Sequence, residues 1–246
     1  MSSKAGRRSG ATALAALALH VVLSAGGAEA LQALPVAPGA TSVRAADPAG
    51  DARFAGGVFR IGPFLRERLI GRNWHPGCPV GLDDLRLVRV SYWDFRERVR
   101  TGPLVLNESV ADDVLWVFKQ LFRAGFPIHR IALPARYRPP TREDWFNTHD
   151  RSSSFNCRPA TGSAGSLSHH SYGWAVDVNP LENPYVRSDG SVLRRAAKPF
   201  VDRTHHVPGM VHPGDIVVRS FARIGWEWGG DWVTLKDYMH FSLTGR

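Results

Sequence analysis

A single carboxylate inside an apolar run constrains this chain more than any other feature of its sequence. Asp177 lies between two valines in the segment SHHSYGWAVDVNP, residues 168–180. A carboxylate buried in a strand loses its hydration, so it must face a cation or several hydrogen-bond donors. His170 precedes it by a six-residue spacer in which Gly173 permits a turn. We therefore expect the carboxylate to fold back toward the imidazole, so that both share one metal ion.

A second motif, WEWGGDWVTLKDYMHFSL at residues 226–243, adds the groups that such a site still needs. His240 opens a short apolar strand, and Asp237 precedes it by three residues in an expected turn. A hydrolytic zinc centre uses three protein ligands, a fourth position for water, and a separate carboxylate that takes a proton from this water. Two histidines and one aspartate are a suitable ligand set for Zn²⁺.

Together the two motifs resemble those of the zinc D-Ala-D-Ala peptidases. SHHSYGWAVD matches the pattern S-x-H-x-x-G-x-A-x-D, and the closing stretch matches W-G-G-D-W…D-x-x-H-F. This family includes the vancomycin-resistance carboxypeptidases and dipeptidases and the phage L-alanyl-D-glutamate endopeptidases that cut peptidoglycan stem peptides. The order of elements is compatible over residues 150–246, and the resemblance implies a Hedgehog/DD-peptidase-like fold.

The resemblance also implies a role for individual residues. By position, it implies that Ser168 lines the substrate pocket and that Asp237 is the general base, while zinc is held by His170, Asp177 and His240.

It further implies an arginine ahead of the first histidine, which stabilises the oxyanion and the substrate carboxylate. Arg158 in FNCRP is our choice, because it precedes His170 closely and lies on the apolar piece of its region. Arg138 in YRPP resembles the tyrosine-arginine pair of other members and remains the alternative.

The implied function is hydrolysis of a peptide bond in peptidoglycan stem peptides. We favour a D-alanyl-D-alanine carboxypeptidase, because the free carboxylate of its substrate needs a cation such as Arg158. An endopeptidase that cuts within the stem is the alternative: Asp237 stands where the dipeptidases have glutamate, as in the phage-type members, and Ser242 stands where an acidic residue is common. A non-catalytic zinc-binding module is a further alternative, although a binding protein has no need of a base.

The N-terminal region predicts a secreted or cell-envelope protein. Residues 1–30 place three basic residues before the apolar run ATALAALALHVVLSA and end on AEA, as a secretory signal peptide does. A membrane anchor is the alternative, although the run is shorter than a bilayer requires. Residues 31–57 are rich in Ala, Pro and Gly and predict a linker, and residues 58–246 predict the zinc peptidase domain. We expect no stable membrane span after removal of the leader.

The net charge indicates which partners the protein could bind, and the cysteine content indicates which cysteine-based sites it could form. The formal net charge of +9 favours the binding of polyanions. For a secreted protein these are anionic wall polymers, so no nucleic-acid partner is expected. Cys78 and Cys157 are either a disulfide or two buried thiols, and neither lies in a C-x-x-C motif, so a thiolate zinc site is not indicated.

Hydrophobic patterning predicts an α+β domain with a mainly antiparallel sheet flanked by helices. Ser109 and Asp112 are expected to cap the main helix, which ends at GFP from Gly125. The expected elements are a strand pair at 85–95 and 98–107, the main helix with Val110, Val114, Val117, Phe118, Leu121 and Phe122 on one face, a strand at 128–133, a strand at 173–179, a short helix around Val217, Phe221 and Ile224, and a closing hairpin.

Overall fold

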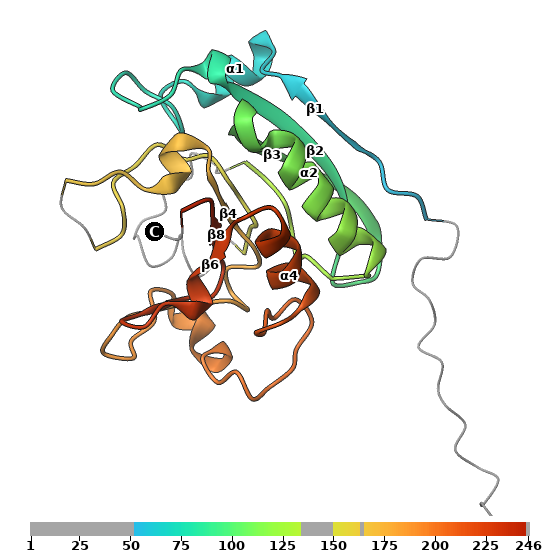
Figure 1. Ribbon diagram of the computed structural model, residues 1–246, viewed down its shortest axis with the longest axis vertical. Helices are drawn as coiled ribbons and strands as arrows, with labels where there is room; N and C mark the ends of the chain where they lie inside the picture. Colours follow the sequence, from blue (N-terminus) through green and yellow to red (C-terminus); the bar gives the residue numbers. More distant parts are fainter. Residues whose placement is uncertain (1–51, 134–149, 163–164, 245–246) are drawn as a thin grey trace, which may run out of the picture. The chain divides into compact units, whose positions relative to one another are not determined.

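The structure is a computed structural model that describes residues 52–133, 150–162 and 165–244 (Figure 1). Helices and antiparallel sheets are interspersed along the chain, which confirms the predicted α+β class. The predicted leader, residues 1–30, lies outside the described residues. The first strand, β1, begins at Gly56, close to the predicted domain start at residue 58.

The first sheet has the strand order β1-β2-β3. The predicted strand pair is confirmed, with each strand slightly shorter than expected. Side chains on one face of β2, such as Val88 and Val90, are fully buried, whereas Arg89 between them is exposed, as expected for a sheet covered on one side. The elements of this part are β1 (Gly56–Arg60), α1 (Pro63–Leu69), the 3-10 helix η1 (Leu82–Asp84), β2 (Leu85–Trp93) and β3 (Val99–Asn107).

Helix α2 (Glu108–Arg123) covers the buried face of this sheet (Figure 1). All six apolar residues predicted for its inner face are buried. The predicted caps were wrong by a few residues: Asn107 is the N-cap, and its Oδ1 accepts a hydrogen bond from the backbone N–H of Ser109 at 3.0 Å. Asn107 is the last residue of β3, so the cap and the strand end coincide. As predicted, the chain turns at Gly125, which has a φ of 68°.

The second half of the chain forms two small antiparallel sheets, with strand orders β4-β8-β6 and β5-β7. The predicted strand at 173–179, the short helix and the closing hairpin are all present, although each strand is short. The elements are η2 (His169–Tyr172), β4 (Ala175–Asp177), β5 (Tyr185–Val186), η3 (Arg195–Phe200), α4 (Ile216–Arg223), β6 (Glu227–Trp228), η4 (Gly229–Asp231), β7 (Lys236–Asp237) and β8 (His240–Ser242). Helix α4 packs against α2, so one core joins the two halves.

The predicted strand at 128–133 is wrong. Successive backbone groups there bond to different partners: the N–H of Ile128 donates to Trp93 O at 2.8 Å, and the N–H of His129 donates to the Asn179 side chain at 3.0 Å. Only isolated bridges form, one of them between Ile131 and Ser152. An apolar run with changing partners cannot build a ladder.

Cys78 and Cys157 form a disulfide that links residues 79 positions apart. The sequence allowed either a disulfide or two buried thiols, and the structure has the disulfide. The bridge lies beside a small second core cluster made of Leu69, Leu82, Leu85, Val105 and Phe155.

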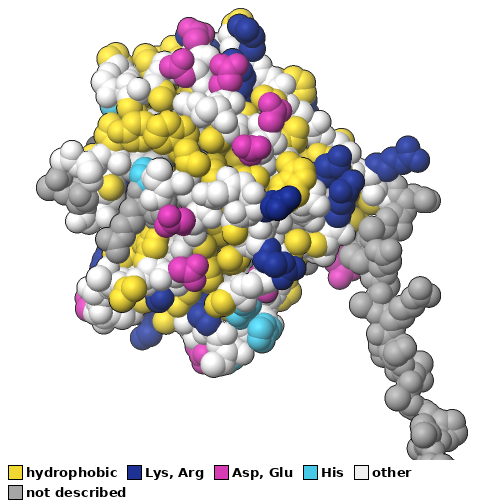
Figure 2. All heavy atoms as spheres, in the orientation of Figure 1, with side chains coloured by type: hydrophobic (Ala, Val, Ile, Leu, Met, Phe, Trp, Pro, Cys, Tyr) yellow, Lys and Arg dark blue, Asp and Glu magenta, His cyan; other side chains and the backbone are white. Residues whose placement is uncertain are grey.

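The distribution of charged side chains on the surface is relevant to the expected binding of polyanions. On the face shown in Figure 2, acidic side chains lie among the basic ones, so the positive net charge does not form one continuous patch there. Among the described residues, no helix has both the length and the apolar character needed to cross a membrane.

Candidate metal centre

Strand register places two of the three expected metal ligands face to face. In the antiparallel pair of β4 and β8, Asp177 lies directly opposite His240. Opposed residues of such a pair project to the same side of the sheet, within reach of one another. The Oδ1 atom of Asp177 lies 3.2 Å from Nδ1 of His240. The sequence motifs are far apart in the chain, but β-pairing brings their polar side chains together.

The third side chain arrives from the turn that precedes β4. His170 lies on η2, and Gly173 ends this 3-10 helix in the left-handed conformation, with a φ of 73°. A Cβ atom on Gly173 would lie 2.5 Å from the backbone nitrogen of Asn107, so a larger residue does not fit. The turn directs Nε2 of His170 to within 3.2 Å of Asp177 Oδ1. The fold-back expected from the glycine is present.

The hydrogen bonds of His170 leave one ring nitrogen free for a cation. Its Nδ1 lies 2.6 Å from the backbone carbonyl of Ser154, where Nδ1–H can only donate. In the neutral ring, Nε2 then carries a lone pair, and this buried atom has no hydrogen-bond partner. A lone pair beside a carboxylate oxygen is repulsive unless a cation lies between them.

The donor set fits a zinc ion. One donor atom from each of His170, Asp177 and His240 lies within 4.8 Å of the other two. Two imidazole nitrogens and one carboxylate oxygen are typical ligands of zinc. A carbonyl that accepts from the second ring nitrogen, as Ser154 does, is the usual way to fix a metal-binding histidine.

The charges around Asp177 keep it ionised. Burial acts to raise its pKa, but His170 and His240 outweigh burial and hold the pKa of Asp177 well below its usual range. The carboxylate needed for a cation site is therefore charged at neutral pH.

The pKa of Asp237 is shifted in the opposite direction, upward. Burial, together with the charge of Asp177, raises the pKa of Asp237 to about 7, although His240, Arg158 and Arg194 act to lower it. Its Oδ1 atom is buried without a hydrogen-bond partner. A carboxyl group whose pKa lies near neutrality can both take up and release a proton under working conditions.

The tryptophan-glycine part of the closing motif fixes the backbone at Asp237. A Cβ atom on Gly229 would lie 2.5 Å from the carbonyl oxygen of Asp237, so this close approach requires glycine. The indole N–H of Trp228 donates to the carbonyl of Tyr238 at 2.8 Å. The two residues hold the turn between β7 and β8, which carries Asp237 at one end and His240 at the other.

The expected arginine lies beside the cluster. The charge of Arg158 acts on the pKa of Asp237, and the side chain of Arg158 is half-buried. Its Nη1 donates to two neutral acceptors, Pro159 O at 3.1 Å and Thr161 Oγ1 at 3.3 Å. The alternative, Arg138, lies outside the described residues.

A second arginine was missed by the sequence analysis. Arg194 is buried at 8% exposure. Burial lowers the pKa of Arg194, and the charges of Asp177, Asp150, Asp237 and Glu182 raise it. The negative charge of nearby carboxyl groups thus favours the charged guanidinium. Arg194 belongs to the long stretch after Pro180, where no pattern marked one charged residue as buried.

Ser168 has a local structural role. It is the N-cap of η2, and its side chain accepts a hydrogen bond from the backbone N–H of His170 at 3.4 Å. It is buried beside the ligand, as expected. Its contact with substrate stays a prediction.

The comparison with known families fits this geometry. Residues 161–243 match the D-alanyl-D-alanine carboxypeptidase family. The match confirms the resemblance drawn from the two motifs and supports a hydrolytic peptidase. It spans the three candidate ligands and Asp237 but begins after Arg158. The α+β architecture is consistent with a peptidase of this family. No curated protein and no solved structure matches the chain significantly.

Proposed function

We propose that this protein is a secreted zinc-dependent peptidase that hydrolyses peptidoglycan stem peptides, with D-alanyl-D-alanine carboxypeptidase activity. The observation that carries the proposal is the convergence of three side-chain donors beside a buried carboxyl group with a raised pKa. The family match over residues 161–243 supports peptide hydrolysis. The signal-peptide pattern of residues 1–30 supports secretion to the cell envelope.

In this proposal His170, Asp177 and His240 hold the zinc ion. When bound, zinc supplies Lewis acidity, which polarises a scissile carbonyl and makes water a better nucleophile. Asp237 accepts the proton of the attacking water at its carboxylate and passes it to the departing amine. Without the ion the pKa of Asp237 is raised to about 7. A cation nearby would lower this pKa, which favours the carboxylate that accepts the proton.

Arg158 binds negative charge on the substrate. Its Nη1 bonds only to neutral oxygens among the described residues, so its charge remains available to an anion. Arg194, by contrast, is buried, and the charges of four carboxyl groups already act on it. A C-terminal carboxylate of a stem peptide supplies the matching anion, which favours the carboxypeptidase over the endopeptidase.

A non-catalytic zinc module has less support. A binding protein gains nothing from burying an extra carboxyl group, and the unpartnered oxygen of Asp237 costs free energy in the folded protein. A proton acceptor at this position explains why such a group is present.

The test is digestion of purified muropeptides by the wild-type protein and by Asp237→Asn, followed by mass spectrometry. We expect the wild type to remove one terminal alanine. Turnover should fall about 10²- to 10⁴-fold in the variant, the usual effect of removing a general base. Zinc content, measured by elemental analysis, should not change.

The outcomes separate the alternatives. A cut within the stem would replace the carboxypeptidase by the endopeptidase. Undiminished turnover in Asp237→Asn would remove the proposed base, and a wild-type protein that binds zinc without hydrolysing any stem peptide would favour the binding module.

A further inference from the structure

An irregular stretch of chain, which we call the 152–158 segment, runs beside two of the three proposed zinc ligands. Ser153 exchanges two backbone hydrogen bonds with Asp177, at 3.0 and 2.8 Å. The next residue, Ser154, offers its carbonyl to Nδ1 of His170 at 2.6 Å. The backbone of one segment therefore holds two of the three proposed ligands.

The same segment also holds the 3-10 helix that carries His170. The N–H of Asn156 donates to the carbonyl of His170 at 3.1 Å. The N–H of Arg158 donates to Ser171 Oγ at 2.9 Å, and this hydroxyl donates back to the carbonyl of Arg158 at 2.9 Å. Any movement of the segment would thus shift both the main chain and the ring of His170.

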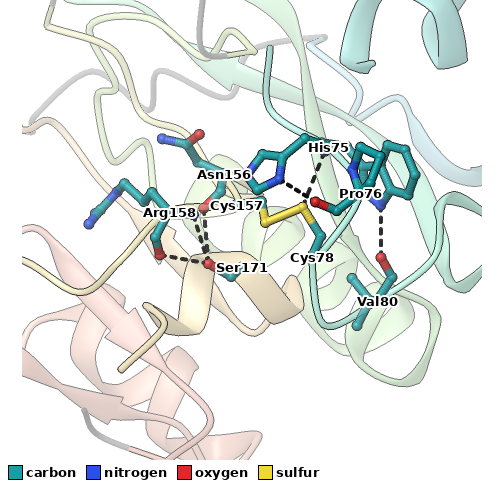
Figure 3. The surroundings of a disulfide bond; sticks show 9 residues. His75, Pro76, Cys78, Val80, Asn156, Cys157, Arg158 and Ser171 are labelled. Carbon is teal, nitrogen blue, oxygen red and sulfur yellow. Dashed lines mark hydrogen bonds between the residues drawn. A yellow bond between two sulfur atoms is a disulfide. The ribbon is translucent and has the colours of Figure 1, made fainter. Parts of the chain in front are cut away.

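The end of the segment nearest Arg158 is held by a covalent bond. Cys157 forms the disulfide with Cys78, and its N–H donates to the carbonyl of Asn73 at 2.8 Å. Figure 3 shows the bridge between the loop at Cys78 and the residues that contact Ser171. The middle of the segment is held by β3, through hydrogen bonds that both backbone groups of Val105 make.

Apart from the disulfide, this end is held by individual hydrogen bonds to Asn73, Ser168 and η2. No residue of the segment belongs to a named strand, so it lacks the continuous ladder of hydrogen bonds that holds β2 and β3. Cys157 packs in the small second core cluster, apart from the larger core of α2 and the first sheet. The disulfide adds a covalent restraint to these separate hydrogen bonds.

We infer that the Cys78–Cys157 disulfide positions His170 for metal binding through the 152–158 segment. Opening the disulfide weakens zinc binding in a protein that stays folded. This inference rests on the proposed zinc function. The two cysteines are positioning residues, since neither is among the proposed ligands.

The physical reason is the conformational entropy that the segment loses when zinc binds. With the disulfide closed, the backbone of Ser153, which bonds to Asp177, and the carbonyl of Ser154, which bonds to His170, are fixed before the ion binds. With it open, the segment gains conformational freedom, and metal binding must remove this freedom again. Loss of groups that orient a metal ligand lowers affinity about 10- to 100-fold. We expect a change of this size.

The experiment compares zinc affinity in three forms of the full chain by competition with a chromogenic chelator. The forms are the oxidised wild type, the wild type reduced with tris(2-carboxyethyl)phosphine and then capped with iodoacetamide, and the double variant Cys78→Ser with Cys157→Ser. Reduction breaks the S–S bond and yields two thiols, while the phosphine becomes its oxide with oxygen from water. Capping converts each thiol to a thioether with release of iodide, so that the freed cysteines beside His75 cannot bind zinc themselves. Circular dichroism checks that each form is folded.

A matched control separates positioning from general stability. Leu121→Ala removes a buried side chain of α2 that belongs to neither the segment nor its anchors. The stability that it is expected to lose is similar to that lost on opening the disulfide. Zinc affinity of this control should stay within about threefold of the wild type, by the same chelator assay.

A second readout needs no metal. In the metal-free oxidised protein, ¹⁵N spectra should show a proton fixed on Nδ1 of His170 by the carbonyl of Ser154, and reduction should broaden or average this signal. Equal zinc affinity of the oxidised and reduced forms, with an unchanged ring signal, would overturn the inference and leave the proposed function intact. Failure of the oxidised wild type to bind zinc would instead overturn the proposed function, and the inference with it.

Discussion

Two clusters of three side chains in this protein look alike by distance and differ in chemistry. In each, one donor atom per residue lies within 4.8 Å of the others: His170, Asp177 and His240 in the first, and His75 with the two cysteines in the second. The first cluster is largely buried, and its Nε2 atom of His170 has no hydrogen-bond partner. In the second, both sulfur atoms are joined in a disulfide.

The difference shows that proximity alone does not make a metal site. A ligand atom needs an available lone pair and, for cysteine, the thiolate form. The first cluster keeps its lone pairs because the carbonyl of Ser154 occupies the other ring nitrogen of His170. In the second cluster the bond between the sulfur atoms removes both thiolates, and the cluster serves the fold instead.

The largest expected effect breaks the first cluster only. His240→Ala should reduce zinc content from about one ion per chain to nearly none, because two ligands are too few for a stable zinc site. His75→Ala, the matched control from the second cluster, should leave zinc content unchanged, since His75 is exposed and its neighbours are disulfide-bonded. Elemental analysis after dialysis measures both variants. Loss of zinc from His75→Ala with full retention in His240→Ala would mean that the clusters were assigned the wrong way round.

The next effect concerns the second cluster and stability. Replacing both cysteines by serine should lower the free energy of unfolding of the metal-free protein by about 4 kcal/mol, because the bridge closes a loop of 79 residues. His75→Ala should change it by less than about 0.5 kcal/mol, as is usual for an exposed residue. Urea unfolding at fixed pH gives both values. A loss below about 1 kcal/mol for the serine pair would show that the loop is already ordered without the bridge.

The smallest effect extends the comparison to two buried carboxyl groups. Asp177 faces two imidazoles and has a lowered pKa. Glu182 is also buried, but burial and the neighbouring charge of Asp150 raise its pKa to about 8. In the unfolded chain Glu182 loses its proton near pH 4.5. Between these two pH values the unfolded state binds fewer protons than the folded state, so stability falls as pH rises.

Glu182→Gln should therefore flatten the pH dependence of stability. Relative to the wild type, the variant should gain roughly 1 to 3 kcal/mol as pH rises from about 4.5 to about 8. Urea unfolding at three pH values measures this gain, and the exposed Glu227→Gln serves as the control. Parallel curves for Glu182→Gln and the wild type would show that Glu182 is ionised in the folded protein.

The sequence predicted the polar residues of the site better than it predicted their supports. Asp177 and His240 could be singled out because a charged or polar side chain in an apolar strand needs a partner. Gly173 could be assigned to a turn for its conformational freedom. The carbonyl of Ser154 could not be found in this way, because every residue carries a carbonyl and only the fold decides which one faces His170.

The missed features share one cause, which is that they depend on contacts between distant segments. Arg194 and Glu182 lie in a stretch with little regular structure, and nothing local marks either residue as buried. The strand expected at 128–133 failed because its apolar pattern says nothing about which partner receives each N–H group. Helix α2, whose pattern repeats over four turns, was predicted almost to its ends.

The pairing of Asp177 with His240 has a consequence for how such a protein can vary. Side chains alternate between the faces of a strand, so inserting one residue within β4 or β8 would turn one of the pair to the opposite face. The stretch between β5 and α4, residues 187–215, contains no strand and is under no such parity constraint. Substrate preference can therefore diverge by lengthening or shortening the loops between β4 and β8, while the two short strands keep the spacing of the reactive centre.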